Sequence, residues 1–476
     1  LYEAAVTFES EDGGTRDTGR QRFGFRWFDV VEKDGDKMFF LNGKRVMLIA
    51  AMTRGFWPKN GIFATPEMAK RDMEALIDMG YNMMLLHRAI GQPPVMDYAD
   101  RMGLLTYEEP GGYRVAPNSD DNIEGPDQQA LEWRREKLKR MIIRDRSLPS
   151  MVIYNLKNEA RNAPDEDDVV NVQMVHKLDP SRIITYNSDR NRDIEYYERV
   201  NPDPYKLHML PYDDTLYYHG WWDQHHWFRF AGHVDDNYEN PRFYLRGVVG
   251  APTVPAREDS LYRLDESEII FWGEEGAFGT MVRLQKIKER LEVDPPTGFR
   301  ELEHIDWFEH YDSFLDESGF RSAYPDVDAL TTSLGRNMHY FHGRNIENVR
   351  ISNIADGYNL NGWGSGSTRT DIVDMYRFPT TDEPYLRYYT QPLYVAVKLR
   401  DKVLPPGDSP VVDLWIVNEE NLSGAHTLEL TYEGPDGSTI DSRSFEVEIT
   451  GGVTFGELLK EEVTLPAVSD PGTYMV

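Results

Sequence analysis

Short apolar runs alternate with amphipathic runs from about residue 36 to residue 382. Each apolar run is only a few residues long and ends in polar residues, which is typical of strands buried on both faces of a parallel sheet. The run Pro66–Met79 has helical spacing and begins with a proline after the N-cap residue Thr65. The pattern predicts an α/β fold, a (β/α)8 TIM barrel. Its strands are predicted at Val46–Ala51, Asn82–Leu86, Leu104–Tyr107, Met151–Tyr154, Arg182–Tyr186, Lys206–Leu210 and Ile269–Trp272, with the eighth inside Val349–Trp363.

Both ends of the chain show the two-residue alternation of antiparallel strands. Two strand-like runs, Leu1–Phe8 and Arg22–Val31, precede the barrel, and two strands do not form an independent domain. We therefore expect residues 1–34 to be the end of a β-sandwich, residues 35–385 to be the catalytic barrel, and residues 386–476 to be an incomplete β-sandwich. The predicted strands of the tail are Tyr394–Leu399, Val411–Val417, Thr427–Tyr432, Phe445–Ile449 and Val463–Leu465.

The composition narrows the classes of partner. The formal net charge of −29 argues against binding to nucleic acid or to anionic membrane surfaces. The absence of cysteine excludes disulfides and thiolate metal sites, and no apolar run approaches the roughly 20 residues of a membrane span. We expect a carbohydrate substrate as partner and leave homo-oligomerisation open. Localisation is unknown from the sequence, with a periplasmic or secreted bacterial protein favoured.

Two predicted strands end in carboxylic acids. Asn158-Glu159 follows the fourth strand, and Glu274-Glu275 follows the seventh, about 115 residues later. The carboxyl ends of barrel strands are where such enzymes hold their chemistry. Glycoside hydrolysis needs a pair of carboxyl groups, one to protonate the leaving oxygen and one to attack the anomeric carbon. A single Asn-Glu pair would more often be a solvated turn, but the second strand end favours a catalytic pair.

The chain resembles glycoside hydrolase family 2, which contains β-galactosidases, β-glucuronidases and β-mannosidases. The resemblance covers about residues 1–430 and is closest to the β-galactosidase branch. It implies that Glu159 is the acid/base and Glu274 the nucleophile, with Glu275 as competitor because it occupies the family's aromatic position. It also implies that the two sandwiches are immunoglobulin-like and that the chain is truncated at both ends. The matching segments are Ile143–Ser150 with Asn158-Glu159, Glu274–Ala277, Phe23–Arg26 with Phe40–Lys44, and Met79–Asn82 through Gly103–Glu109.

Several residues are candidates for substrate binding. Trp363 follows the eighth strand, where the family has a tryptophan, and we expect it to stack on a pyranose ring. The aromatic stretch 217–227 is interpreted as a loop after the sixth strand that walls the site, and a metal site there is less favoured. After the second strand the family has Arg and then Ser-His, whereas this chain has Leu85-Leu86-His87-Arg88. The substrate-binding candidates are Asn158, Trp363, Trp221, Trp222, His208, Tyr212 and His87.

Two family motifs that are missing from the chain indicate whether a metal ion is bound and which sugar is the substrate. The β-galactosidase branch often binds magnesium through a Glu-x-His run near the third strand, but Glu108–Gly112 contains no histidine. We therefore predict no metal and no cofactor. Family β-glucuronidases have an Asn-x-Lys motif after the eighth strand, and Gly364–Arg377 contains none. The predicted function is a retaining exo-β-glycosidase acting on a terminal β-galactoside. The alternatives are a β-glucuronidase, a β-mannosidase, or an inactive carbohydrate-binding relative.

Overall fold

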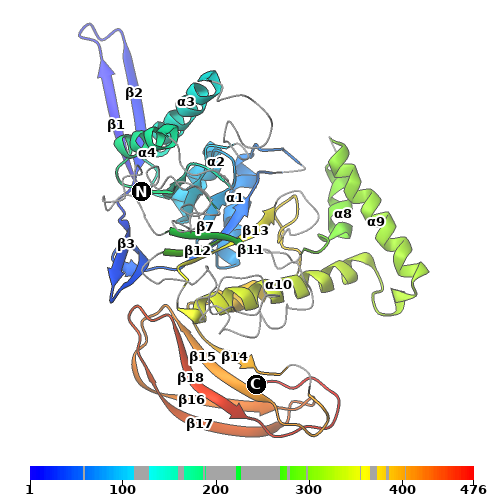
Figure 1. Cartoon of the computed structure of the whole chain (residues 1–476). Helices are drawn as coiled ribbons and strands as arrows, with labels where there is room; N and C mark the ends of the chain where they lie inside the picture. Colours follow the sequence, from blue (N-terminus) through cyan, green and yellow to red (C-terminus); the bar gives the residue numbers. More distant parts are fainter. Residues whose placement is uncertain are drawn as a thin grey trace. The chain divides into compact units, whose positions relative to one another are not determined.

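The computed structural model describes residues 1–56, 59–111, 128–158, 166–185, 188, 221–226, 269–275, 279–295, 298–353, 355–364, 372–381, 385–401 and 404–476. The chain divides into two compact units (Figure 1). The first comprises Leu1–Trp227, Ser267–Met338 and Gly357–Pro384, and the second comprises Phe228–Glu266, His339–Asp356 and Tyr385–Val476.

An eight-stranded parallel sheet forms the centre of the first unit. Its first strand in the chain, β6, pairs in parallel with its last, β13, which is the closing contact of a barrel. The strand order β10-β9-β8-β7-β6-β13-β12-β11 is the cyclic order of a (β/α)8 barrel, interrupted between β10 and β11 within the described residues. The strands are β6 (Leu48–Thr53), β7 (Met83–Leu86), β8 (Leu105–Glu108), β9 (Met151–Asn155), β10 (Ile183–Thr185), β11 (Trp221–His226), β12 (Ile269–Glu275) and β13 (Gly357–Gly364).

The sixth strand of the sheet differs from the prediction. The segment Trp221–His226 forms β11 and pairs in parallel with β12, with Trp221 opposite Ile269. The sequence analysis assigned this segment to a loop, because its polar and aromatic residues do not resemble a buried apolar strand. The predicted strand Lys206–Leu210 lies outside the described residues. The other seven strands lie where the sequence predicts them, within two to three residues at their ends.

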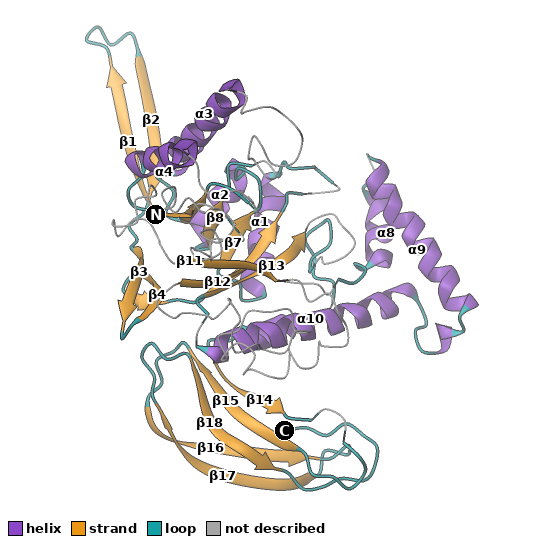
Figure 2. Cartoon of the chain, viewed as in Figure 1, coloured by secondary structure: helices purple, strands orange, loops and turns teal. Residues whose placement is uncertain are grey.

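Helices follow the strands along the chain (Figure 2). The predicted helix after the first strand is confirmed as α1, and the Thr65 side chain accepts a hydrogen bond from the Met68 N–H at its N-terminus. A second long helix, α3, precedes the fourth strand. No helix in the described part of the chain is long and apolar enough to cross a membrane. The helices are α1 (Pro66–Asp78), α2 (Pro93–Met102), α3 (Gln128–Asp145), α4 (Glu166–Leu178), α8 (Leu284–Val293), α9 (Phe299–Glu317), the short η3 (Phe320–Ser322), α10 (Val327–Ser352) and α11 (Tyr385–Tyr389).

The barrel interior is filled by apolar side chains. The cluster includes Leu48, Leu85, Tyr107 and Phe271, all buried, and it is extended by Phe28 and Phe39. These two phenylalanines belong to a small antiparallel sheet made of β3 (Phe28–Lys33), β4 (Asp36–Leu41) and β5 (Lys44–Arg45). The predicted boundary between residues 34 and 35 falls in the turn between β3 and β4. Ahead of this sheet, β1 (Tyr2–Glu9) and β2 (Arg16–Phe23) form an exposed antiparallel hairpin.

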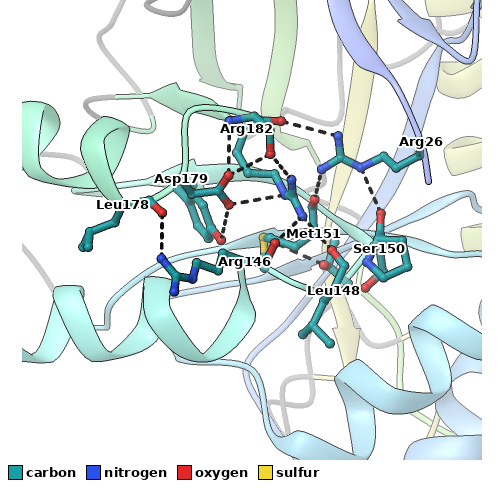
Figure 3. Close-up of polar contacts among 12 residues, drawn as sticks. Arg26, Arg146, Leu148, Ser150, Met151, Leu178, Asp179 and Arg182 are labelled. Carbon is teal, nitrogen blue, oxygen red and sulfur yellow. Dashed lines mark hydrogen bonds and ion pairs between the residues drawn. The ribbon is translucent and has the colours of Figure 1, made fainter. Parts of the chain in front are cut away.

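Two arginine side chains, Arg26 before β3 and Arg182 before β10, bind backbone carbonyl groups around the start of the fourth barrel strand (Figure 3). The guanidinium of Arg26 donates to the carbonyl oxygens of Pro149, at 3.0 Å, and Met151. Arg182 donates to the carbonyl oxygens of Arg146 and Leu148, each at 2.9 Å. Burial and the neighbouring charge of Arg182 lower the pKa of Arg26 to about 10. Both guanidiniums therefore serve as caps for loop carbonyls at the base of the fourth strand.

The second unit contains the predicted β-rich tail. Three antiparallel strands, β14 (Leu393–Leu399), β15 (Val411–Asn418) and β18 (Gly456–Thr464), form one sheet. A second sheet consists of β16 (Gly424–Glu433) and β17 (Thr439–Ile449). The two sheets share an apolar core that includes Leu414, Leu430 and Val463, as expected for a sandwich. The five strands predicted in the tail are confirmed, while the immunoglobulin-like topology stays a prediction.

Candidate active site

Polar side chains follow the apolar layers at the carboxyl end of the barrel. On β7, Leu85 belongs to the interior core, and His87, two residues further, continues on the same face. On β8, Glu109 follows Tyr107 in the same way. Asn155 ends β9, and Glu274 and Asn361 lie in β12 and β13. Each of these five polar side chains is no more than 3% exposed. This end of the barrel is therefore a buried polar layer above an apolar core.

A β-bulge at Gly273 turns Glu274 toward this layer. Along β12, Trp272 is paired with Gln224 and Glu274 with His225, so Gly273 is an extra residue relative to β11. The register against β13 shifts across the same residues. Because one inserted residue reverses the alternation of side chains, Glu274 faces the interior, where regular alternation from Phe271 would direct it outward. The Asn359 side-chain amide donates to the Gly273 carbonyl oxygen and holds the bulge.

The Glu274 carboxylate lies between two polar partners. The amide of Asn361 donates a hydrogen bond to Oε2 at 2.8 Å. His87 Nε2 lies 3.5 Å from Oε1, within the range of an ion pair. The structure thus brings His87, a predicted substrate-binding residue, next to this carboxylate. The Asn361 amide is a donor that suits an ionised carboxylate, which is the form that a nucleophile needs.

The contacts continue beyond His87 across the barrel. His87 Nδ1 lies 3.7 Å from Glu109 Oε2, and the other oxygen of Glu109 accepts a 2.9 Å hydrogen bond from Asn155 Nδ2. The Thr185 hydroxyl donates to Asn155 Oδ1 at 2.9 Å. Glu109, Asn155 and Asn361 are not among the site residues predicted from the sequence. Their common signal is a polar residue at the end of a predicted barrel strand.

Asn158 lies just beyond β9, where a single parallel bridge joins it to Ser188. Its side chain is 2% exposed, and neither its amide nitrogen nor its carbonyl oxygen forms a hydrogen bond with the described residues. A buried amide without a hydrogen bond costs free energy unless a ligand completes it. Glu159, the next residue, lies outside the described residues.

Glu108 is the neighbour of Glu109 but faces the other side of β8. Its Oε1 accepts hydrogen bonds from the Gly91 N–H at 2.7 Å and from Arg144 at 3.2 Å. Burial raises the pKa of Glu108 well above its ordinary value, and the nearby Asp145 raises it further, while Arg144 opposes both effects. Glu108 is thus part of the packing between β8 and α3. Within the described residues, no group of three or more acidic or histidine side chains is arranged to hold a metal ion.

Trp363 does not have the environment predicted for a sugar platform. It is 0% exposed, its indole N–H donates to Asp72 Oδ1 at 2.6 Å, and its ring meets Tyr81 edge-on. Asp72 is a buried residue of α1 and also pairs with Arg377 at 3.0 Å. Asp72 belongs to the helix α1 outside the sheet, so the Trp363 indole packs against the helix layer in this structure, and its role as a sugar platform stays a prediction.

The remaining predicted sugar contacts have less structural description. Trp221 and Trp222 are strand residues of β11 and not loop residues, which corrects the predicted aromatic wall at this position. Their side chains lie outside what the structure describes, as do His208 and Tyr212 altogether. Contact of these four residues with a sugar stays a prediction.

The parallel strands follow one another in the order of a (β/α)8 barrel, and the Glu274 carboxylate lies at their carboxyl end. Barrel enzymes hold their catalytic groups at this end. Residues 32–212 match the family model "Glycosyl hydrolases family 2, TIM barrel domain". This match confirms the resemblance of the chain to glycoside hydrolase family 2. The match ends before β12, so it does not include Glu274.

Known relatives resemble less than half of the chain. A protein of Formosa agariphila named "Putative beta-glucuronidase" is 29% identical over 196 residues, which is 38% of this chain and 22% of that protein. A "Beta-galactosidase" of Pectobacterium atrosepticum is 25% identical over 209 residues, covering 43% of this chain and 19% of that protein. The chain therefore aligns with about a fifth of the length of these relatives.

One solved structure supports the fold over nearly the whole chain. The exo-chitosanase CsxA of Amycolatopsis orientalis superposes with a TM-score of 0.64 at 13% identity, covering 99% of this chain and 51% of that chain. At this identity the likeness establishes the architecture and leaves the substrate open.

Proposed function

We propose that the protein is a retaining exo-β-glycosidase that hydrolyses a terminal β-linked sugar. The observation that carries the proposal is the Glu274 carboxylate, buried at the carboxyl end of the barrel with a hydrogen bond from Asn361 and with His87 at 3.5 Å. A carboxylate held in this way is suited to attack an anomeric carbon. The family of residues 32–212 supports a glycosidase.

Glu274 is assigned as the nucleophile and Glu159 as the acid/base. In the first step, a Glu274 oxygen bonds to the anomeric carbon while Glu159 gives its proton to the glycosidic oxygen, and the bond to the leaving alcohol breaks. In the second step, Glu159 takes a proton from water, the water oxygen bonds to the anomeric carbon, and the Glu274 ester breaks. The free sugar leaves with its β configuration, and both carboxyl groups return to their starting states.

The choice of Glu274 over Glu275 is supported by the bulge at Gly273. Glu274 faces Asn361 and His87 in the interior layer. Glu275 is paired with the buried residue Leu360 of β13. The two neighbours of Leu360 in that strand are Asn359 and Asn361, and their side-chain amides donate to the Gly273 carbonyl oxygen and to Glu274. Successive residues of a strand point to opposite faces, so one of the two glutamates is available to the substrate.

Asn158 is proposed to bind a sugar hydroxyl. Its buried amide has a donor and an acceptor without hydrogen bonds, and it directly precedes the proposed acid/base. A hydroxyl close to the reacting carbon would satisfy both, and such bonds strengthen in the transition state of glycoside hydrolysis.

A β-galactoside is the proposed sugar, and the absence of an Asn-x-Lys run in Gly364–Arg377 counts against a glucuronide. Relatives named for β-galactoside and β-glucuronide hydrolysis match to a similar extent. The sugar is therefore to be decided by a panel of nitrophenyl β-glycosides, with β-galactoside expected to be turned over fastest and β-glucuronide and β-mannoside as the competing outcomes.

Labelling and stereochemistry test the mechanism. A 2-deoxy-2-fluoro glycoside of the preferred sugar should become covalently attached to Glu274, as seen by peptide mass spectrometry. Proton NMR should show the β anomer as the first product. Glu159→Ala should keep more activity on substrates with good leaving groups and be rescued by azide, which replaces water without needing a base. Sugar binding without turnover or labelling would favour the inactive carbohydrate-binding alternative, and an α anomer would refute retention.

A further inference from the structure

Three buried side chains form a line across the barrel interior. Glu274 lies on β12, His87 follows β7 and Glu109 follows β8. The two nitrogens of His87 lie 3.5 Å from Glu274 and 3.7 Å from Glu109, and all three residues are 2% exposed. Because β12 and β7 are not neighbours in the sheet, the contact between His87 and Glu274 spans the barrel.

Glu109 is the fixed end of this line. One of its oxygens accepts a 2.6 Å hydrogen bond from the backbone N–H of Arg88, and the other accepts from Asn155. Asn155 is itself held by the Thr185 hydroxyl. The Arg88 N–H belongs to a residue with a φ of 53°, a left-handed conformation that costs on the order of 1 kcal/mol for a residue other than glycine. The chain thus adopts a strained turn where its N–H meets this carboxylate.

We propose that Glu109 is a positioning residue for Glu274 and acts through His87. An imidazole that faces a carboxylate at each nitrogen can donate to both only as the protonated imidazolium, and the carboxylate at Nδ1 then fixes the ring so that Nε2–H points toward the other partner. Here the partner is the Glu274 carboxylate, which the imidazole N–H stabilises in its ionised form and holds in one rotamer. Catalytic hydrogen bonds are often long in the free enzyme and tighten when the substrate is bound. This inference rests on the proposed role of Glu274 as nucleophile.

Glu108 supplies a matched control. It is adjacent to Glu109 in the chain, equally buried, and hydrogen-bonded to a backbone N–H in the same way. It differs in facing Arg144 and α3 instead of the interior layer. Replacing either glutamate with glutamine removes one buried carboxylate from the end of β8, and only Glu109→Gln removes the carboxylate that faces His87.

The test compares Glu109→Gln, Glu108→Gln and the wild-type protein, each shown to be folded. The readouts are kcat and KM on the preferred nitrophenyl β-glycoside and the rate of Glu274 labelling by the fluorinated sugar. We expect Glu109→Gln to lower kcat and the labelling rate by about 10²-fold, the scale of a misplaced reacting group, with KM nearly unchanged. Glu108→Gln should keep kcat, and Thr185→Val should lower it by a smaller factor.

The outcomes are separable. Unchanged kcat in Glu109→Gln, equal losses in both glutamine variants, or a change in KM alone would overturn the positioning role. If Glu109→Gln does not fold, kcat is measured for His87→Gln instead. An unchanged kcat in that variant also overturns the positioning role of Glu109, which acts through His87. If the wild-type protein is labelled at Glu274 and Glu109→Gln is fully active, the positioning role is refuted and the proposed function is retained. Wild-type protein that is neither active nor labelled overturns both.

Discussion

The side-chain amide of Asn361 donates a 2.8 Å hydrogen bond to Glu274 from the neighbouring strand. Both residues are buried, and β12 and β13 are adjacent in the sheet, so the bond belongs to the rigid part of the barrel. A donor fixed on a strand costs little reorganisation when charge changes during the reaction.

Replacing Asn361 with alanine should therefore impair catalysis more than substrate binding. Loss of one preorganised donor typically costs about 10²-fold in rate, and we expect a loss of that size in kcat for Asn361→Ala. Steady-state kinetics on a nitrophenyl β-glycoside measures it, with the thermal midpoint recorded alongside to show that the protein is folded. Retained kcat in a folded variant would contradict the role of this hydrogen bond.

The two adjacent glutamates at the end of β12 should respond differently to the same change. Glu274→Gln removes the proposed nucleophile and should abolish turnover, with azide failing to restore it. Glu275→Gln is expected to keep most of the activity, because the bulge at Gly273 gives the interior position to Glu274. Each variant serves as the control for the other, and the reverse pattern would transfer the nucleophile to Glu275.

Trp363→Phe should destabilise the protein without altering sugar affinity. The substitution keeps an aromatic ring but removes the N–H that donates to the buried Asp72. A hydrogen bond to a charged group contributes about 1.5–3 kcal/mol, and a loss in this range should appear in urea unfolding. A marked rise in KM with unchanged stability would instead restore the sugar-platform interpretation.

Glu108→Gln should change the pH dependence of stability. Because the pKa of Glu108 is raised in the folded protein, its ionisation in the unfolded chain from about pH 4.5 upward disfavours folding. Its contribution to stability is complete below that pH and is lost as the pH rises toward the folded pKa. The unfolding free energy of the variant relative to wild type should therefore increase from pH 4 to pH 7. A difference that does not change with pH would contradict the raised pKa.

The apolar strands of the barrel could be predicted from sequence because their pattern is local. Met151–Asn155 and Ile269–Glu275 are short apolar runs ending in polar residues, and no distant contact is needed to recognise them. The strand Trp221–His226 could not be predicted in this way. Its residues have no strand periodicity, and its parallel pairing with β12 is a tertiary contact that overrides local preference.

In the candidate site, too, features with a local sequence signal are predictable and features that depend on strand pairing are not. The position of Glu274 at a strand end is visible in the sequence, but its inward direction depends on the bulge at Gly273, which only the pairing with β11 and β13 reveals. The face of the sheet on which Trp363 lies cannot be read from the sequence for a similar reason. The register of β13 shifts between Asn361 and Gly364, and counting along the strand across that shift does not give the face on which the indole lies.

The pairing of β6 with β13 has a practical consequence for dividing the chain. The two strands are separated by about 300 residues, yet each supplies the hydrogen-bonding edge of the other. A fragment that ends at residue 212, where the family match stops, would keep β6 and lose its partner. It would expose a long unprotected edge, which invites aggregation and proteolysis. Expression of the catalytic half alone therefore requires the segment through residue 381, whose last barrel strand closes the ring.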